Sequence, residues 1–136
     1  MKNDMTIARL GAAAGVGVET VRYYQRRGLL PTPERPGGYG SGGAIRRYDE
    51  HDLRKLRFIR SAQTAGFTLD EIGTLMALDS TEDRAQARAM AKVRIAALDA
   101  KLAELKRARS SLAKLAKECG SGTSGPCPIL EAFEDA

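Results

Sequence analysis

RAQARAMAKVRIAALDAKLAELKRARSSLAKLAKEC, residues 84–119, is the stretch that decides the fold of this chain. Within it Leu98, Leu105, Leu112 and Cys119 follow one another at steps of seven, and neither proline nor glycine interrupts the run. Such a repeat predicts helices wound around each other. At 1.5 Å per residue the helix would be roughly 50 Å long, too long to bury its apolar stripe against its own small domain. We therefore predict a helix that pairs with the same helix of a second copy, as a homodimer.

The composition narrows the class of protein. The chain has 136 residues, which suits one small domain with an appendage. No apolar run reaches membrane-spanning length and no signal peptide opens the chain, so we expect a cytoplasmic protein with reduced thiols. With His51 as the one histidine, a three-histidine metal site or a histidine-based catalytic triad within one chain is excluded.

Positive charge gathers in the N-terminal half. Residues 1–67 hold 12 Lys and Arg against 6 Asp and Glu, a net of +6, whereas residues 68–136 hold 10 against 11, a net of −1. Arginines predominate among the N-terminal cations, and a guanidinium makes bidentate contacts with phosphate and with guanine. A basic head predicts a nucleic-acid partner, and a merely solvated basic surface is the alternative.

Two short helices joined by a glycine-containing turn are predicted in this head. After a loose start over residues 1–5, Thr6 caps the first helix, 15–18 form the turn, and the second helix runs from about Glu19 to Arg27 before Gly28 ends it. This is the pattern of a helix-turn-helix, whose second helix lies in the major groove of DNA. The residues that would meet base edges are Val18, Glu19, Thr20 and Arg22.

A glycine-rich run, Gly37–Gly43, leads into a short β-like segment, Ile45–Tyr48. Beside a helix-turn-helix, a hairpin of this composition predicts a wing, with Arg46 and Arg47 reaching phosphates or the minor groove. A loop that cradles nucleotide phosphates is the alternative, but it lacks the Gly-Lys-Ser/Thr signature and a preceding hydrophobic strand.

Two further helices are expected before the long one. Asp49 should cap the first, over about 50–65, and Thr68 with Glu71 forms a capping box for the second, which should run to about Leu78. The predicted organisation is a winged helix-turn-helix DNA-binding domain over 1–78, a linker over 79–83, the dimerisation helix over 84–119, and an effector-binding loop with a short terminal helix over 120–136.

Two cysteines flank a glycine-rich loop near the C-terminus. The loop lets Cys119 and Cys127 face one point, and Pro128 can start a short helix whose dipole lowers the pKa of the Cys127 thiol. Two soft sulfurs favour Cu(I), Ag(I), Au(I) or Hg(II) and suit zinc poorly. By spacing alone, a reversible disulfide, two unrelated thiols, or a plain coiled coil with Cys119 as a small buried residue also remain open.

Several motifs resemble the MerR family of bacterial transcription regulators. They are the runs Val18–Leu30, Ile45–Tyr48, Leu56–Arg60, Gly66–Ile72 and Cys127–Leu130, together with the long helix and the paired cysteines. The resemblance covers nearly the whole chain, and the head is most similar to the mercury-responsive members. It implies a mainly α protein: a winged helix-turn-helix homodimer whose long helices pair antiparallel.

The resemblance also implies a mechanism and site residues. The effector-bound dimer of such a regulator bends and untwists promoter DNA, which lets RNA polymerase use the promoter, whereas the unliganded dimer often represses. The DNA-binding residues would be Val18, Glu19, Thr20, Arg22, Tyr23, Tyr24, Arg26, Arg46, Arg47 and Tyr48. Cys119 and Cys127 match the metal-binding cysteines.

Two features depart from the family pattern. The glycine-rich loop is longer than usual, and the third cysteine that mercury-type members donate across the dimer is absent, since Arg84 stands at its position with Ser80 nearby. Copper-type members also lack that cysteine. Two thiolates with a monovalent ion keep a net charge of −1, which Arg84 from the partner could neutralise, whereas Hg(II) would leave the site neutral.

The predicted function is a metal-responsive transcription regulator and not an enzyme, because no base–nucleophile pair or cofactor motif is found. Its effector would be a thiophilic ion, either Hg(II) or of the Cu(I) type. One alternative is a thiol redox or electrophile sensor on the same scaffold. Another is a DNA-binding repressor whose cysteines carry no signal.

Overall fold

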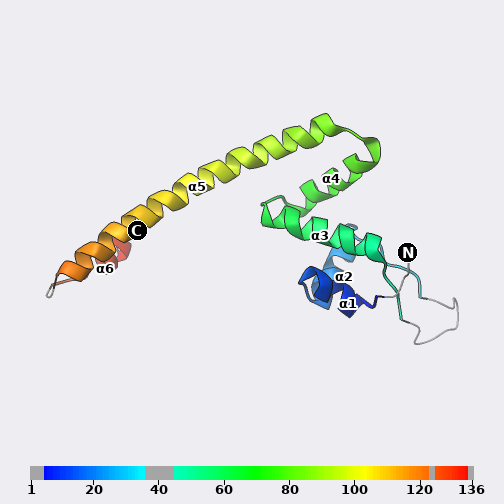
Figure 1. Cartoon of the computed structure of the whole chain (residues 1–136), viewed down its shortest axis with the longest axis horizontal. Coiled ribbons are helices and arrows are strands. Elements are labelled where there is room, and N and C mark those ends of the chain that lie inside the picture. Colours follow the sequence, from blue (N-terminus) through cyan, green and yellow to red (C-terminus); the bar gives the residue numbers. More distant parts are fainter. Residues whose placement is uncertain (1–4, 36–44, 123–124, 135–136) are drawn as a thin grey trace. The chain divides into compact units, whose positions relative to one another are not determined.

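The computed structural model describes residues 5–35, 45–122 and 125–134, and the chain divides into two compact units, Met1–Ala87 and Arg88–Ala136. The helices follow the chain as α1 Ile7–Ala14, α2 Val18–Arg26, α3 Glu50–Thr64, α4 Leu69–Thr81, α5 Arg84–Ser121 and α6 Pro128–Glu134 (Figure 1). Over the described residues no strand forms, and β pairing is limited to an isolated antiparallel bridge between Met5 and Tyr48. The predicted mainly α fold is confirmed.

The turn between α1 and α2 depends on two glycines. Gly15 adopts a left-handed φ of 75° and ends α1, as a C-terminal glycine cap does. At Gly11 an added Cβ would lie 2.6 Å from the carbonyl oxygen of Val16, because the turn folds back onto the helix at this point. Thr6 caps α1 as predicted, its Oγ1 accepting a hydrogen bond from the backbone N–H of Arg9 at 3.2 Å.

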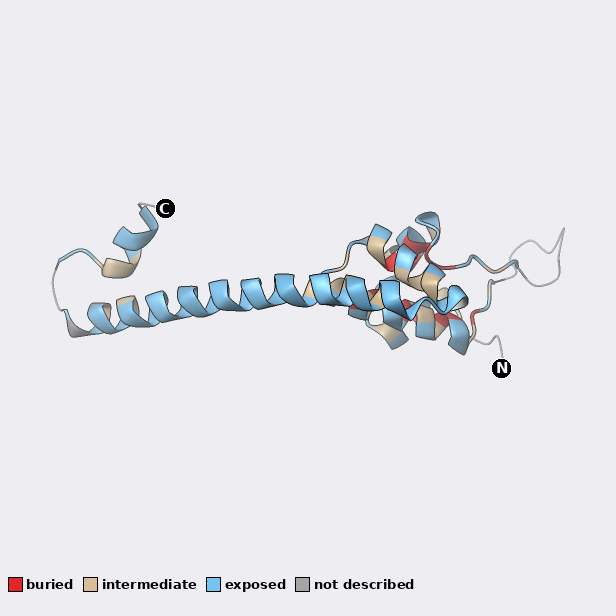
Figure 2. Cartoon of the chain, turned by 90° about the horizontal axis from the view of Figure 1, so that it is seen from above, coloured by how far each residue is buried: buried red, intermediate tan, exposed pale blue. Residues whose placement is uncertain are grey.

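The core of the first unit lies among α1, α2, α3, α4 and the segments that join them (Figure 2). Helix α1 packs against α2 and α3, and α3 packs against α4. The buried apolar side chains are Leu10, Val21, Tyr24, Leu29, Leu30, Tyr48, Leu56, Ile59, Ala62 and Ile72. This packing fixes α2 on the unit, so that its remaining faces are presented to solvent.

Two capping boxes start α3 and α4. At α4 the predicted reciprocal bonds join Thr68 and Glu71. At α3 the carboxylate of Asp49 accepts from the N–H of Asp52 at 3.0 Å, and that of Asp52 accepts from the N–H of Asp49 at 3.0 Å. The second box was not predicted, because Asp is a rarer partner at this position than Glu or Gln.

Several boundaries differ from the prediction, and α5 continues past Cys119 to Ser121. Helix α4 continues past Leu78 to Thr81 and ends where Glu82 takes a left-handed φ of 57°, a stop that neither glycine nor proline marks in the sequence. The predicted loose start also ends sooner, because Met5 and Tyr48 exchange backbone hydrogen bonds of 3.1 and 2.9 Å. A single bridge between segments so far apart in the chain leaves no local sequence signal.

The second unit contains most of α5 together with α6. The predicted long helix is confirmed. Several large apolar residues of α5 are exposed along the helix, whose ribbon has the pale blue of exposed residues over most of its length (Figure 2). They are Val93, Ile95, Leu98, Leu102, Leu105 and Leu112. No helix in the described part of the chain combines the length and apolar character needed to cross a membrane.

Candidate DNA interface and thiol site

Helix α2 presents a polar, exposed face. The exposed members of the predicted DNA-binding set on it are Glu19, Arg22, Tyr23 and Arg26, and the half-buried ones are Val18 and Thr20. An Nη1 of Arg22 lies 2.8 Å from Oε1 of Glu19, one turn earlier, and this pair holds the guanidinium over the N-terminal half of the helix. Base readout by a helix-turn-helix uses this half of the second helix.

Tyr23 is flanked by two arginines, Arg26 and Arg27, of which Arg27 was not among the predicted site residues. The guanidiniums of Arg26 and Arg27 lie 5.9 and 5.8 Å from the centre of its ring, within cation–π range. Arg27 also donates to the Tyr23 hydroxyl at 3.0 Å and to a carboxylate oxygen of Asp70 at 3.1 Å. The hydrogen bond to Tyr23, more than the carboxylate, raises the pKa of Arg27. This chain of contacts joins α2 to the first turn of α4.

A pocket of about 290 Å³ opens between α2 and the segment that leads into α3. Its lining residues are Ile7, Arg22, Gln25, Thr32, Arg35, Ile45, Arg46 and Tyr48. The side-chain amide of Gln25 donates to the Tyr48 hydroxyl at 2.9 Å and to the carbonyl oxygen of Pro31 at 3.2 Å. Gln25 therefore ties the exposed helix to the chain on both sides of the predicted wing loop, whose residues Gly37–Gly43 lie outside the described residues.

The two thiols come together in the second unit. Sγ of Cys119, in the last turns of α5, lies 3.3 Å from Sγ of Cys127, which precedes α6. Both are free cysteines and half-buried. They line a pocket of about 250 Å³ together with Glu118, Gly122, Gly125, Pro126 and Pro128. The loop thus brings the two sulfur atoms together, as its composition predicted.

The surroundings shift the pKa values of the two thiols in opposite directions. The backbone N–H groups of α6 lower the pKa of Cys127, first that of Leu130, and the S–H of Cys119 adds to the effect. The same hydrogen bond, with the negative charge on Cys127, raises the pKa of Cys119. The pKa of Cys127 is therefore shifted toward the thiolate and that of Cys119 toward the thiol.

Two family descriptions match the chain. Residues 5–79 match "MerR HTH family regulatory protein" and residues 53–115 match "MerR, DNA binding". This chain belongs to the MerR family. Because the members of this family are DNA-binding regulators, the chain is a regulator and not an enzyme.

Individual MerR-family proteins align with nearly all of it. The mercuric resistance operon regulatory protein of Serratia marcescens is 39% identical over 132 residues, which are 96% of this chain and 88% of that protein. The lead(II) complex of the transcription regulator PbrR691 from Ralstonia metallidurans CH34 is similar at 36% identity and a TM-score of 0.65, covering 95% of this chain and 98% of that one. The mercury(II) complex of MerR from Bacillus megaterium MB1 gives 30% identity and a TM-score of 0.59, covering 96% and 99%.

In this MerR-family head, two tyrosines of the predicted DNA-binding set are buried in the core. Tyr24 is 2% exposed and its hydroxyl donates to Oε1 of Gln63, so it packs α2 against α3. Tyr48 is also 2% exposed, with its hydroxyl in the pocket beside Gln25. Tyr23 belongs to the exposed polar face of α2. Tyr24 does not, because positions 21 and 24 both face the core.

The segment before α3 carries the predicted wing arginines. Arg46 is half-buried and Arg47 exposed. Apart from the Tyr48 bridge, Ile45–Tyr48 shows no regular pairing with another described segment, so the β-like run forms no strand.

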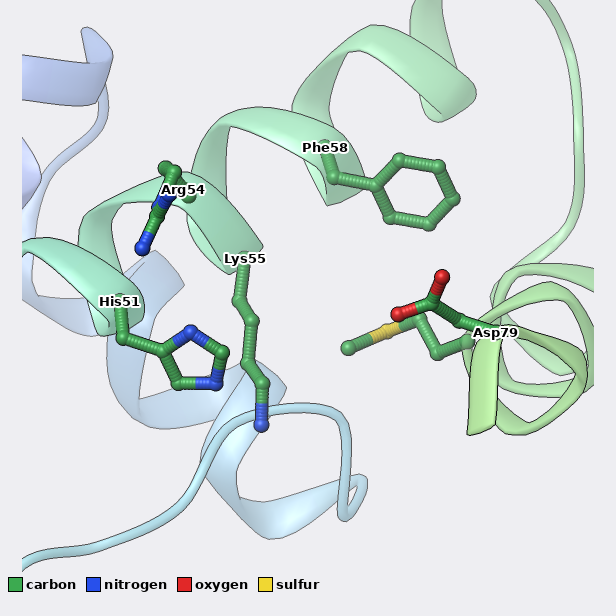
Figure 3. A pocket seen from close by; sticks show the side chains of 6 residues that line it. His51, Arg54, Lys55, Phe58 and Asp79 are labelled. Atoms are coloured by element: carbon green, nitrogen blue, oxygen red, sulfur yellow. The ribbon is translucent and has the colours of Figure 1, made fainter. Parts of the chain in front are cut away.

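The MerR-family head has a second pocket, of about 450 Å³, between α3 and α4 (Figure 3). Its lining residues are His51, Arg54, Lys55, Phe58, Met76 and Asp79. Phe58 and Met76 give it an apolar wall, and the basic side chains of α3 lie across from the Asp79 carboxylate. None of the predicted site residues lines it. The sequence does not reveal it because α3 and α4 are separate amphipathic patterns until they pack.

The two residues predicted to assist the thiols are at the other end of the long helix. Arg84 is the first residue of α5, and Ser80 belongs to α4. No cluster of three or more His, Cys, Asp or Glu that could hold a metal ion is found in the described part of the chain. Cys119 and Cys127 are two thiols that lie together in the described structure.

Proposed function

We propose that this protein is a metal-responsive transcription regulator that binds promoter DNA as a homodimer and activates transcription when a thiophilic ion binds Cys119 and Cys127. The observation that carries the proposal is the 3.3 Å approach of the two sulfurs, on the same chain as a helix-turn-helix. The mercury-related and lead-bound relatives support a soft ion as the effector. Such a protein would act in the cytoplasm, where its promoter lies.

The dimer is inferred from α5. Its exposed leucines follow the predicted seven-residue repeat, and a second copy of the same helix is the surface that matches them. An antiparallel pair would place the first turn of one α5 beside the last turn of the other. The two recognition helices would then read one promoter, and a change at the thiol site would distort that DNA for RNA polymerase, which the protein reaches through the DNA.

The donor set fits a soft ion of low coordination number. Two thiolates suit Hg(II) and the Cu(I) group, and no third ligand is needed for either. Arg84 begins α5 and Cys119 lies near its end, so in an antiparallel pair the Arg84 of one copy would lie beside the thiols of the other. In the dimer, Arg84 and Ser80 would lie beside the two thiolates without binding the ion. The positive charge of Arg84 would favour a monovalent ion, because two thiolates with such an ion keep a net negative charge.

The test is an anaerobic titration of the reduced, dimeric protein with Cu(I) and with Hg(II), each in competition with a soft chelator. We expect tight, stoichiometric binding of one ion per thiol pair, with Cu(I) preferred over Hg(II) because Arg84 offsets the remaining charge. If the ions bind but Hg(II) is preferred, the charge role of Arg84 is wrong. If neither ion competes with the chelator, the effector is not a metal, and a repressor without a metal signal remains.

A thiol redox sensor is the second candidate, because the same 3.3 Å approach places Cys119 and Cys127 within easy reach of a disulfide. A mild oxidant would convert the pair, and the DNA-bound state would follow the redox state. Under reducing conditions this sensor shows no stoichiometric metal binding, which separates it from the first proposal.

The DNA function predicts a specific loss on replacement of Arg22 by alanine. If its guanidinium reads a base, the variant should bind its promoter about 1–3 kcal/mol more weakly and discriminate less at one base pair. Fluorescence anisotropy on the promoter and on single-base variants measures both effects. Arg107→Ala, the same change on the exposed surface of α5, is the control. Wild-type affinity and specificity in Arg22→Ala would remove this residue from the interface.

A further inference from the structure

A polar bridge joins the end of helix α2 to the start of α4. Arg27 follows the last residue of α2, and Asp70 lies in the first turn of α4. One Nη of the Arg27 guanidinium donates to a carboxylate oxygen of Asp70 at 3.1 Å, and the other donates to the Tyr23 hydroxyl at 3.0 Å. Because α2 packs against α1 and α4 packs against α3, Arg27 adds a direct link between α2 and α4.

The bridge depends on the shape of the guanidinium. This group is planar and holds its donors in a fixed fork, so an oxygen bound at one Nη fixes the direction of the other. The Asp70 carboxylate therefore determines where the second Nη of Arg27 lies, and the Tyr23 hydroxyl is its acceptor. A lysine has a compact ammonium on a flexible stem and does not hold two acceptors in one fixed arrangement.

The bridge ends on an exposed ring of the recognition helix. Tyr23 is 40% exposed, and the guanidiniums of Arg26 and Arg27 flank its ring. Because the hydroxyl oxygen of Tyr23 accepts from Arg27, its proton is left to donate to a further group. Asp70 and Arg27 thus fix the place of a donor on the exposed face of α2.

The bridge is too exposed to matter much for folding. The side chain of Asp70 is 93% exposed and that of Arg27 is 40% exposed. Exposed ion pairs contribute little to the stability of a folded protein. A carboxylate beside a DNA-binding face also repels a polyanion. The bridge therefore opposes DNA binding unless it orders the side chains of that face.

We propose that Asp70 is a positioning residue for DNA binding, which acts through Arg27 to hold the Tyr23 hydroxyl in place. The proposal rests on the proposed function, in which α2 lies on the promoter. A side chain that is already ordered loses less conformational entropy when it forms a hydrogen bond across an interface. An acidic residue of α4 would thus strengthen the binding of DNA, opposite to the effect of its charge alone.

The test uses the full-length protein and a duplex that the wild type selects from a random library. Arg27→Lys keeps the charge and removes the fork, so it should weaken binding roughly two- to tenfold, the range for loss of one hydrogen bond. Asp70→Ala removes the carboxylate and should also weaken binding, although the loss of a negative charge alone would strengthen it. Arg107→Lys, the same change on the exposed surface of α5, should bind as the wild type does. Fluorescence anisotropy measures each affinity.

Tyr23→Phe shows whether the effect passes through the hydroxyl. Once the hydroxyl is absent, its position no longer matters, so Arg27→Lys should cause no further loss in a Tyr23→Phe protein. A merely structural role of Arg27 would persist in that background. Thermal unfolding of each variant reports whether the head is still folded.

The outcomes separate this proposal from the function on which it rests. If Asp70→Ala binds the duplex more tightly than the wild type, the carboxylate only repels DNA, and the proposal is overturned. Wild-type affinity in Arg27→Lys would show that the fork is not needed, which also overturns it. An equal loss from Arg27→Lys with and without the Tyr23 hydroxyl would mean that Arg27 acts by itself, against the proposal. If the wild type selects and binds no duplex, the proposed function itself fails.

Discussion

Cys127→Ser is expected to abolish tight binding of the soft ion, with a loss of more than about 100-fold in affinity. A serine hydroxyl is a hard, protonated oxygen that soft ions do not favour, so a single thiolate would remain. Changes outside the ligand shell already cost about 10–100-fold, and removal of one of two ligands should exceed that. Competition with a soft chelator under anaerobic, reducing conditions measures the loss.

Ala132→Ser is the matched control, since it introduces the same residue in α6 without touching a thiol, and it should bind as the wild type does. Cys119→Ser should behave like Cys127→Ser. If Cys127→Ser kept the ion, the ligands would have to be sought elsewhere in the chain, and the two-thiolate site would be wrong.

The same site predicts a pH dependence. Metal binding needs both thiolates, and the raised pKa of Cys119 means that its proton must leave when the ion enters. The lowered pKa of Cys127 means that this thiol gives up its proton more readily than Cys119. Affinity should therefore rise with pH, by about tenfold per unit for each proton released on binding, until pH passes the pKa of Cys119. Repeating the wild-type titration between pH 6 and 8 measures the slope.

Leu105→Lys is expected to turn the dimer into monomers. Leu105 is 53% exposed on the single chain and stands at the centre of the seven-residue repeat. In a symmetric dimer the change removes two buried leucines, at about 1.5–3 kcal/mol each, which raises the dissociation constant by roughly 10²–10⁴. Lysine has nearly the helix propensity of leucine, so the loss reports on the interface between chains. Sedimentation equilibrium at micromolar protein gives the mass.

Ala103→Lys is the control for this experiment. It adds the same side chain and the same charge two residues away, off the apolar stripe, and should leave the dimer intact. A Leu105→Lys protein that stays dimeric would show that the stripe is not the seam between the two chains.

Much of this structure could be predicted because its signals are local. The caps at Thr6 and Thr68 depend on residues within one turn, and the length of α5 follows from an uninterrupted repeat. The thiol site could be predicted for the same reason. A short glycine-rich loop joins its two cysteines, and Pro128 starts the helix that lowers the pKa of Cys127. The division of the chain at residues 78–84 into a DNA-binding domain and a dimerisation helix stays a prediction.

The sequence by itself therefore determined the elements, the recognition helix and the thiol pair, since each is encoded in spacing along one segment. Only the tertiary structure decided what depends on segments far apart in the chain. Packing against α3 made Tyr24 a core residue, and the bridge to Met5 fixed Tyr48 beside Gln25. The same folding brought Arg35 and Arg46 to one pocket. The periodic position of a side chain predicts which way it faces, but the residues that it contacts depend on how the other segments fold against it.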